Sequence, residues 1–266
     1  MLLEKVISAL KTPNIKFLNA LYQAVMVNRL TFHCIEVYLY RSPANGIPMM
    51  NELASELPHI ASDQLNGMII PSKTCLTVVD VQKDFTAPDG LVAQYGADMT
   101  TVEPTIHRIE KLVEAARKVG VTVVHMRVVT SPETDSEAVK KLYERRGMPG
   151  GQAICRKGEG DVYYRIFPEV GDIEIPKLMF NGFHDTELES KLRKQGIDTM
   201  LFTGFTTDCC VFSTANDAFH RNFNTFIVSD ACSAYEPELH LSALEIMQKN
   251  FALLIHTEDV LASWKI

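Results

Sequence analysis

The feature that most constrains the fold is a regular alternation of short apolar runs with amphipathic stretches, from about residue 74 to the C-terminus. The apolar runs, such as CLTVVD and TMLFTG, are rich in β-branched residues and indicate buried strands. The stretches between them have helical spacing, and 104–120 ends in Gly120, a helix-stop signal. Strands that alternate with helices over about 190 residues predict an α/β fold, with three αβα layers around a mostly parallel sheet.

The expected strands are 75–80, 121–129, 171–177, 199–204, 225–230 and 251–257. The expected helices are 104–120, 186–196, 208–222, 237–250 and 259–264. Residues 130–160 are polar and contain GMPGG, which predicts a long excursion over the surface.

The first 70 residues differ from this pattern. They have apolar residues at helical spacing that Pro13 interrupts, which predicts a mostly helical N-terminal extension of unknown role. Within them, the stretch from residue 58 onward, PHIASDQLNGMIIPSKT, has the composition of a linker. We therefore expect two parts, an extension over 1–70 and a domain over 71–266.

Charge and cysteine content exclude several classes of protein. The formal net charge is −7, whereas general nucleic-acid or anionic-membrane binding requires a basic face. The six cysteines include no C-x-x-C pair, so their spacing matches neither a disulfide framework nor a zinc site. We expect a cytoplasmic protein with a small-molecule substrate and with no nucleic-acid or membrane partner.

Three reactive residue types fall at the carboxyl ends of expected strands, where sites in parallel sheets lie. Asp80 ends CLTVVD, Lys177 ends GDIEIPK, and Cys209 and Cys210 open the helix after TMLFTGFTT. Taken alone, an aspartate at the end of a strand is commonly a turn cap, a lysine there is commonly solvated, and a cysteine in a helix is commonly a small core residue. Their coincidence at one sheet edge favours a catalytic site.

A thiol at a helix N-terminus faces unpaired N–H groups and the positive end of the helix dipole. A nearby ammonium would further lower the thiol pKa, and a carboxylate could take the proton. The same N–H groups could hold the oxyanion that forms when sulfur attacks a carbonyl. Adjacent helical residues point about 100° apart, so only one of Cys209 and Cys210 is expected to face the site.

Three segments carry a family resemblance: VVDVQKDF, IPKLMFNGFHDTEL and GFTTDCCVFSTANDA. They resemble the signatures of the isochorismatase-like cysteine hydrolases, a family that includes nicotinamidases, N-carbamoylsarcosine amidohydrolase and ureidoacrylate amidohydrolase. The resemblance runs from about Thr74 to Trp264. It implies that Asp80 (and not Asp84), Lys177 and Cys210 are the catalytic residues, because Cys210 is the cysteine directly before the valine.

The resemblance also implies a cis peptide bond between Phe205 and Thr206, with an oxyanion hole formed by the backbone amides of Thr206 and Cys210. Nicotinamidases carry an Asp-x-His pair and a further histidine that bind a metal, and the segment HMRVVTSPETDSE lacks that cluster. We therefore predict no metal and no cofactor, and we expect His125 to be a core histidine.

The sequence gives less direct evidence for the residues that contact the substrate. Phe85, Leu91, Phe183 and Gln82 follow the motif residues and are candidates for the pocket, with ordinary packing as the alternative. Arg156 and Lys157 are candidates for an anion site, with solvated charge as the alternative.

The predicted function is metal-independent hydrolysis of a C–N bond in a small amide or ureido compound, through a thioester on the cysteine. One alternative is vinyl-ether hydrolysis with Asp80 as the acid. Another is a non-catalytic binding member of the family. Because the family commonly forms oligomers, a homodimer or homotetramer is expected.

Overall fold

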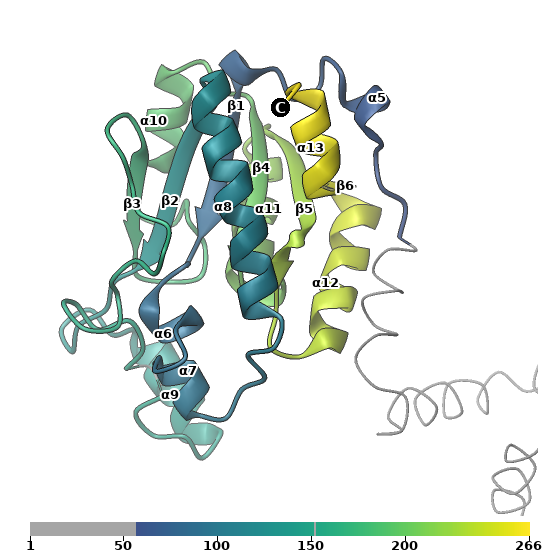
Figure 1. The fold of residues 1–266 in the computed structure, drawn as a ribbon. Helices are drawn as coiled ribbons and strands as arrows, with labels where there is room; N and C mark the ends of the chain where they lie inside the picture. The colour runs from purple at the N-terminus through teal and green to yellow at the C-terminus, as the bar shows by residue number, and fades with distance from the viewer. Residues whose placement is uncertain (1–56, 152) are drawn as a thin grey trace, which may run out of the picture. The chain divides into compact units, whose positions relative to one another are not determined.

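The computed structural model describes residues 57–151 and 153–266, which contain a six-stranded sheet in the order β3-β2-β1-β4-β5-β6 (Figure 1). All neighbouring strands are parallel. The strands are β1 Thr74–Val79, β2 Thr122–Val128, β3 Ile173–Lys177, β4 Thr199–Phe205, β5 Asn224–Ser233 and β6 Leu253–Ile255. The predicted parallel α/β sheet is confirmed.

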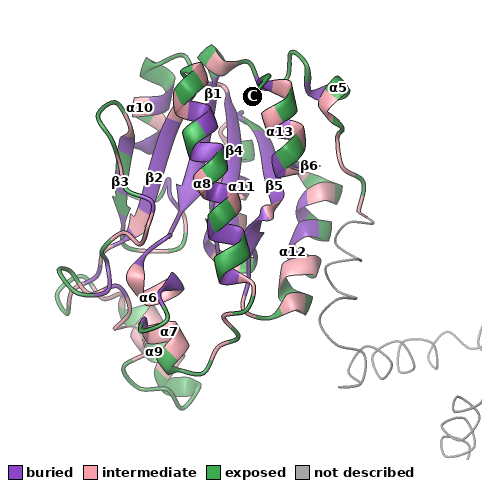
Figure 2. Cartoon of the chain, in the orientation of Figure 1, coloured by how far each residue is buried: buried purple, intermediate pink, exposed green. Residues whose placement is uncertain are grey.

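Helices cover both faces of this sheet, as predicted for the αβα layers (Figure 1). Apolar residues of α8 and α13 pack on one face, and those of α10, α11 and α12 pack on the other. The main helices are α8 Val102–Val119, α10 Leu188–Lys194, α11 Phe212–His220, α12 Pro237–Asn250 and α13 Thr257–Ser263. The shorter ones are α5 Ser62–Leu65, α6 Lys83–Thr86, α7 Leu91–Gln94 and α9 Glu137–Arg145. Figure 2 shows the buried residues concentrated in the strands and on the inward sides of the helices.

The centre of the sheet is the pair β1 and β4, in which every residue is buried. Gly204 pairs with Val79 and has φ +112°, and a Cβ there would lie 2.1 Å from the Val79 carbonyl oxygen. Only glycine fits this close approach of two backbones. The chain passes from β1 outward to β2 and β3, and from β4 outward to β5 and β6. The crevice for a ligand is therefore expected outside the carboxyl ends of β1 and β4.

Two segments differ from their predicted form. The excursion 130–160 contains the helix α9, none of whose residues is buried. The expected linker packs on the domain: Leu65 and Ile69 belong to its core, and the Trp264 indole N–H donates to the Ile69 carbonyl at 3.2 Å. The predicted helical character of the N-terminal extension lies outside the described residues. Within the described ranges, no helix combines the length and apolar character that crossing a bilayer requires.

Candidate active site

Asp80 and Lys177 form a fully buried pair at the carboxyl edge of the sheet. Lys177 Nζ donates to Asp80 Oδ2 at 2.8 Å and to the Met179 carbonyl at 3.1 Å. Both side chains are 0% exposed. Asp80 has φ +52°, in the left-handed region that aspartate tolerates better than most residues, and it turns the chain out of β1. Its second oxygen, Oδ1, is buried and has no hydrogen-bond partner among the described residues.

This environment shifts both pKa values. Burial raises the pKa of Asp80, and the opposing effects of Lys177 and the Cys210 thiol do not cancel it. Burial lowers the pKa of Lys177, but Asp80 and Cys210 outweigh burial and raise it above its ordinary value. The pair therefore holds an ammonium beside a carboxylate that accepts a proton more readily than an exposed one.

The predicted nucleophile lies in a π-helical turn, η2 Thr207–Val211, between β4 and α11. The Thr206 carbonyl accepts the N–H groups of Cys209 and Val211, both at 3.1 Å, so these two bonds bracket Cys210. Cys210 is 5% exposed, whereas Cys209 is half-buried. The predicted cis peptide bond between Phe205 and Thr206 is present. Single π-type turns are rare and often occur at functional sites.

The predicted low pKa of Cys210 is wrong for this arrangement. A hydrogen bond with the Cys209 thiol, followed by burial, raises the pKa of the Cys210 thiol well above its ordinary value, although Lys177 opposes the shift. The same contact lowers the pKa of Cys209. A thiol with a raised pKa needs a base to remove its proton before it can attack a carbonyl.

Side-chain bonds join the loop after β3 to the turn that carries Cys210. The Thr214 hydroxyl donates to the Cys210 carbonyl at 2.7 Å and accepts the Gly182 N–H at 3.0 Å. Asn181 Nδ2 donates to Asp217 Oδ2 at 2.7 Å. The second and third sequence motifs thus form one connected structure around Lys177 and Cys210.

Comparisons with known proteins agree with this arrangement. The model of the isochorismatase domain matches residues 74–259. The chain belongs to the isochorismatase family. Ureidoacrylate amidohydrolase of Methylobacterium radiotolerans is 34% identical over 196 residues, which cover 68% of this chain and 75% of that protein.

Two solved structures are also similar to this chain. A cysteine hydrolase from Pseudomonas syringae pv. phaseolicola has a TM-score of 0.64 and 26% identity, over 74% of this chain and 94% of that one. An N-carbamoylsarcosine amidase from Thermoplasma acidophilum has a TM-score of 0.55 and 28% identity, over 70% and 97%. This member of the isochorismatase family is an amidohydrolase, a hydrolase of C–N bonds, in agreement with the predicted enzyme class.

Two of the four candidate substrate contacts, Gln82 and Phe183, have structural partners within the fold. The Gln82 side chain is completely buried and bonds to backbone: its Nε2 donates to the carbonyls of Val128 and Asp161, and its Oε1 accepts the Val128 N–H. Phe183 belongs to the core and packs on Phe223, with ring centroids 5.9 Å apart. These bonds and contacts serve the fold, and contact of Gln82 or Phe183 with a substrate stays a prediction.

Phe85 and Leu91 are half-buried on α6 and α7, which follow Asp80 at the carboxyl edge. Their substrate contact stays a prediction. Arg156 forms a two-pronged ion pair with Asp135, with both N–O distances at 2.7 Å, so its charge is neutralised within the fold. Lys157 is exposed.

His125 is a core histidine, as predicted, and it is 1% exposed and bonded to Asp172 at 3.1 Å. Over 57–151 and 153–266, no group of three or more His, Cys, Asp or Glu side chains is arranged to hold a metal ion. The absence of a metal or other cofactor stays a prediction.

Three further residues near Asp80 or Cys210 carried no motif signal in the sequence. Buried Cys155 lies in the excursion, after α9, and its N–H donates to Asp84 Oδ2 at 2.7 Å. Burial raises the pKa of its thiol, and the neighbouring Asp80 raises it further. Tyr235 and His240 come from the segment between β5 and α12 and the first turn of α12. The sequence signal that could have identified Tyr235 and His240 was their position, because both follow β5, which ends at the same edge of the sheet as β1.

Proposed function

We propose that this chain hydrolyses a C–N bond of a small ureido or amide compound through a thioester on Cys210. The observation that carries the proposal is the state of Asp80: one carboxylate oxygen is bound to Lys177, and the other is buried with no hydrogen-bond partner among residues 57–151 and 153–266. A carboxylate with a raised pKa and a vacant lone pair near a neutral thiol is suited to act as a general base.

In the proposed first half-reaction, Asp80 takes the proton of the Cys210 thiol as sulfur attacks the substrate carbonyl. The oxyanion accepts hydrogen bonds from the amides of Thr206 and Cys210. The tetrahedral intermediate collapses, the C–N bond breaks, and Asp80 gives its proton to the leaving nitrogen. Lys177 balances the negative charge throughout.

In the second half-reaction, Asp80 takes a proton from water as the water oxygen attacks the thioester carbonyl. The C–S bond breaks, the proton returns to sulfur, and the acid product leaves. No metal or cofactor takes part in this scheme. A ureido substrate is favoured over other amides because relatives named ureidoacrylate amidohydrolase match this chain at 34% identity.

Ammonia release from a panel of compounds tests the proposal. The panel contains ureidoacrylate, saturated ureido acids, nicotinamide and a simple aliphatic amide, with isochorismate assayed separately for vinyl-ether cleavage. We expect turnover of at least one ureido compound and a loss of about 10³-fold or more in kcat/KM for Cys210→Ala.

The matched control is Cys75→Ala, which removes an equally buried thiol from the start of β1, at the opposite end of the sheet. It is expected to keep kcat within about twofold. Near-full turnover of the true substrate by Cys210→Ala would rule out the thioester. Cleavage of isochorismate by that variant would favour the vinyl-ether alternative. The predicted homo-oligomer is proposed on the resemblance, and the cytoplasmic location is proposed on the cysteine pattern.

A further inference from the structure

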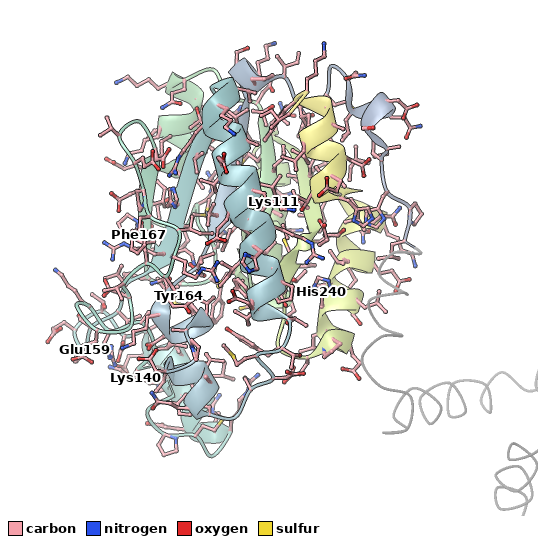
Figure 3. All side chains as sticks on the ribbon, viewed as in Figure 1. Lys111, Lys140, Glu159, Tyr164, Phe167 and His240 are labelled. Atoms are coloured by element: carbon pink, nitrogen blue, oxygen red, sulfur yellow. The ribbon has the colours of Figure 1, made fainter. Side chains whose placement is uncertain are left out.

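The segment 235–240, between β5 and the first turn of α12, bonds to two loops that meet at the site. The Tyr235 hydroxyl donates to the Phe85 carbonyl at 2.8 Å. The His240 ring nitrogen Nδ1 lies 2.8 Å from the Thr207 hydroxyl oxygen. Figure 3 labels His240 on the α12 side of the molecule. Both contacts join residues distant in sequence, so each fixes one loop against another.

The first contact reaches the loop that carries the proposed base. The Phe85 N–H donates to the Gln82 carbonyl at 3.1 Å, and the Gln82 N–H donates to the Asp80 carbonyl at 2.9 Å. Backbone hydrogen bonds therefore connect the anchor point of Tyr235 to Asp80 in two steps. The Gln82 side chain is hydrogen-bonded to the backbone of Val128 in β2. The backbone connection between Phe85 and Asp80 is therefore held in place at its midpoint.

The second contact reaches the turn that carries the proposed nucleophile. Thr207 is 0% exposed and is the first residue of the π-helical turn, three positions before Cys210. Burial lowers the pKa of His240 to about 4, so at neutral pH the ring is uncharged. A neutral imidazole can satisfy the buried hydroxyl of Thr207 without placing a charge in this buried turn.

We propose that segment 235–240 is a brace that sets Cys210 against Asp80, with Tyr235 and His240 as positioning residues. The inference rests on the proposed function, since it assigns the brace to the thiol–carboxylate proton transfer. That transfer needs hydrogen-bond geometry, and a misplacement of about 1 Å can cost on the order of 10²-fold in rate. Neither side chain needs to touch the substrate.

The test compares brace variants with chemically matched controls elsewhere in the fold. Tyr235→Phe is paired with Tyr163→Phe, which removes a hydroxyl bonded to Glu174 at 3.0 Å. His240→Leu is paired with His59→Leu, which removes a ring nitrogen 2.8 Å from the Ser229 hydroxyl. His240→Asn is the rescue variant, because its amide can occupy the place of Nδ1.

For the brace variants we expect kcat to fall about 10- to 100-fold with KM within about threefold. We also expect alkylation of Cys210 by iodoacetamide, followed by mass spectrometry of its peptide, to accelerate at least about fivefold, because a loosened turn exposes the thiol. The control variants are expected to stay within about twofold in both measurements, and His240→Asn to recover most of kcat.

Equal behaviour of brace and control variants in both measurements would overturn the proposal. Alkylation needs no substrate, so the brace is tested even if no panel compound is turned over. Loss of activity in Cys210→Ala together with brace variants that match their controls would reject the brace and keep the proposed function. Full activity in Cys210→Ala would reject the proposed function itself.

Discussion

Two aspartates of the same sheet show how the partners of a carboxylate decide its role. Asp172 precedes β3 at the amino edge, and its Oδ2 accepts bonds from Arg117 (2.6 Å), the Glu169 N–H (2.9 Å) and His125 (3.1 Å). Asp80 follows β1 at the carboxyl edge and has Lys177 as its side-chain donor, with Oδ1 unpartnered among the described residues. Both are shielded from water, but among the described residues three groups donate hydrogen bonds to Asp172 at 2.6–3.1 Å, whereas Lys177 donates one, at 2.8 Å, to the Asp80 carboxylate.

The pKa shifts of the two groups have opposite signs. At Asp172, burial raises the pKa, but bonds from Arg117, the Glu169 N–H and His125 outweigh it, so the net pKa is lowered. At Asp80, burial prevails and the pKa is raised. A carboxylate with several donors is a structural anion, and one with a vacant oxygen is available for proton transfer.

The largest expected effect comes from Asp80→Asn, which keeps the shape and removes the base. We expect kcat/KM for the ureido substrate to fall about 10²- to 10⁴-fold, the usual contribution of a general base. The substitution also leaves Lys177 buried without a counter-charge, so unfolding by urea is measured in parallel. Wild-type kcat/KM in a folded Asp80→Asn variant would refute the role of Asp80.

Asp172→Asn is the matched control, because it makes the same substitution in the other carboxylate. We expect its unfolding free energy to fall by about 1–3 kcal/mol, since it removes charge-assisted bonds, while kcat stays within about twofold. A catalytic loss as large as that of Asp80→Asn would show that the contrast between the two groups is false.

A smaller effect is expected in the pH dependence. The proposed base must be ionised, so kcat/KM should fall as pH is lowered through the raised pKa of Asp80. This acid limb of the pH profile should therefore lie at a higher pH than the one at which an exposed aspartate titrates. Asp172 has a lowered pKa, so its contribution to stability is present above its unfolded pKa and is lost as pH falls through its folded pKa.

Activity is therefore expected to decline at a higher pH than the one at which Asp172 is protonated. Steady-state rates across pH, with circular dichroism at each pH, separate the two events. An acid limb at or below the titration range of an exposed aspartate would contradict the raised pKa of Asp80.

The strands and most helices were predictable because each buries an apolar stripe that the sequence repeats. Helix α9 was missed because the surrounding segment is polar and contains GMPGG, although the helix itself has apolar residues at helical spacing and buries none of them. β5 continues three residues past the expected end at Asp230, and its register with β4 shifts between Phe202 and Gly204, an irregularity that alternation of residue types does not reveal.

The position of the candidate site was predictable because Lys177 ends a strand and Asp80 and Cys210 follow strands at the same edge of the sheet. The state of the site was not, because the Cys209 thiol and burial raise the pKa of Cys210, and neither effect can be derived from the motif. The structural partners of Gln82 and Phe183 were not predictable for a related reason. Their partners, Val128 and Phe223, are about 40 residues or more away along the chain, and a local pattern carries no information on such contacts.

The most direct test of the central claim is detection of the covalent intermediate. Wild-type protein is mixed with the ureido substrate, quenched in acid within milliseconds to seconds, and digested for mass spectrometry. We predict an acyl group on the peptide that contains Cys210, labile to hydroxylamine, that forms and decays at rates consistent with kcat. Turnover at the full rate with no acyl group on Cys210 at any quench time would contradict the account.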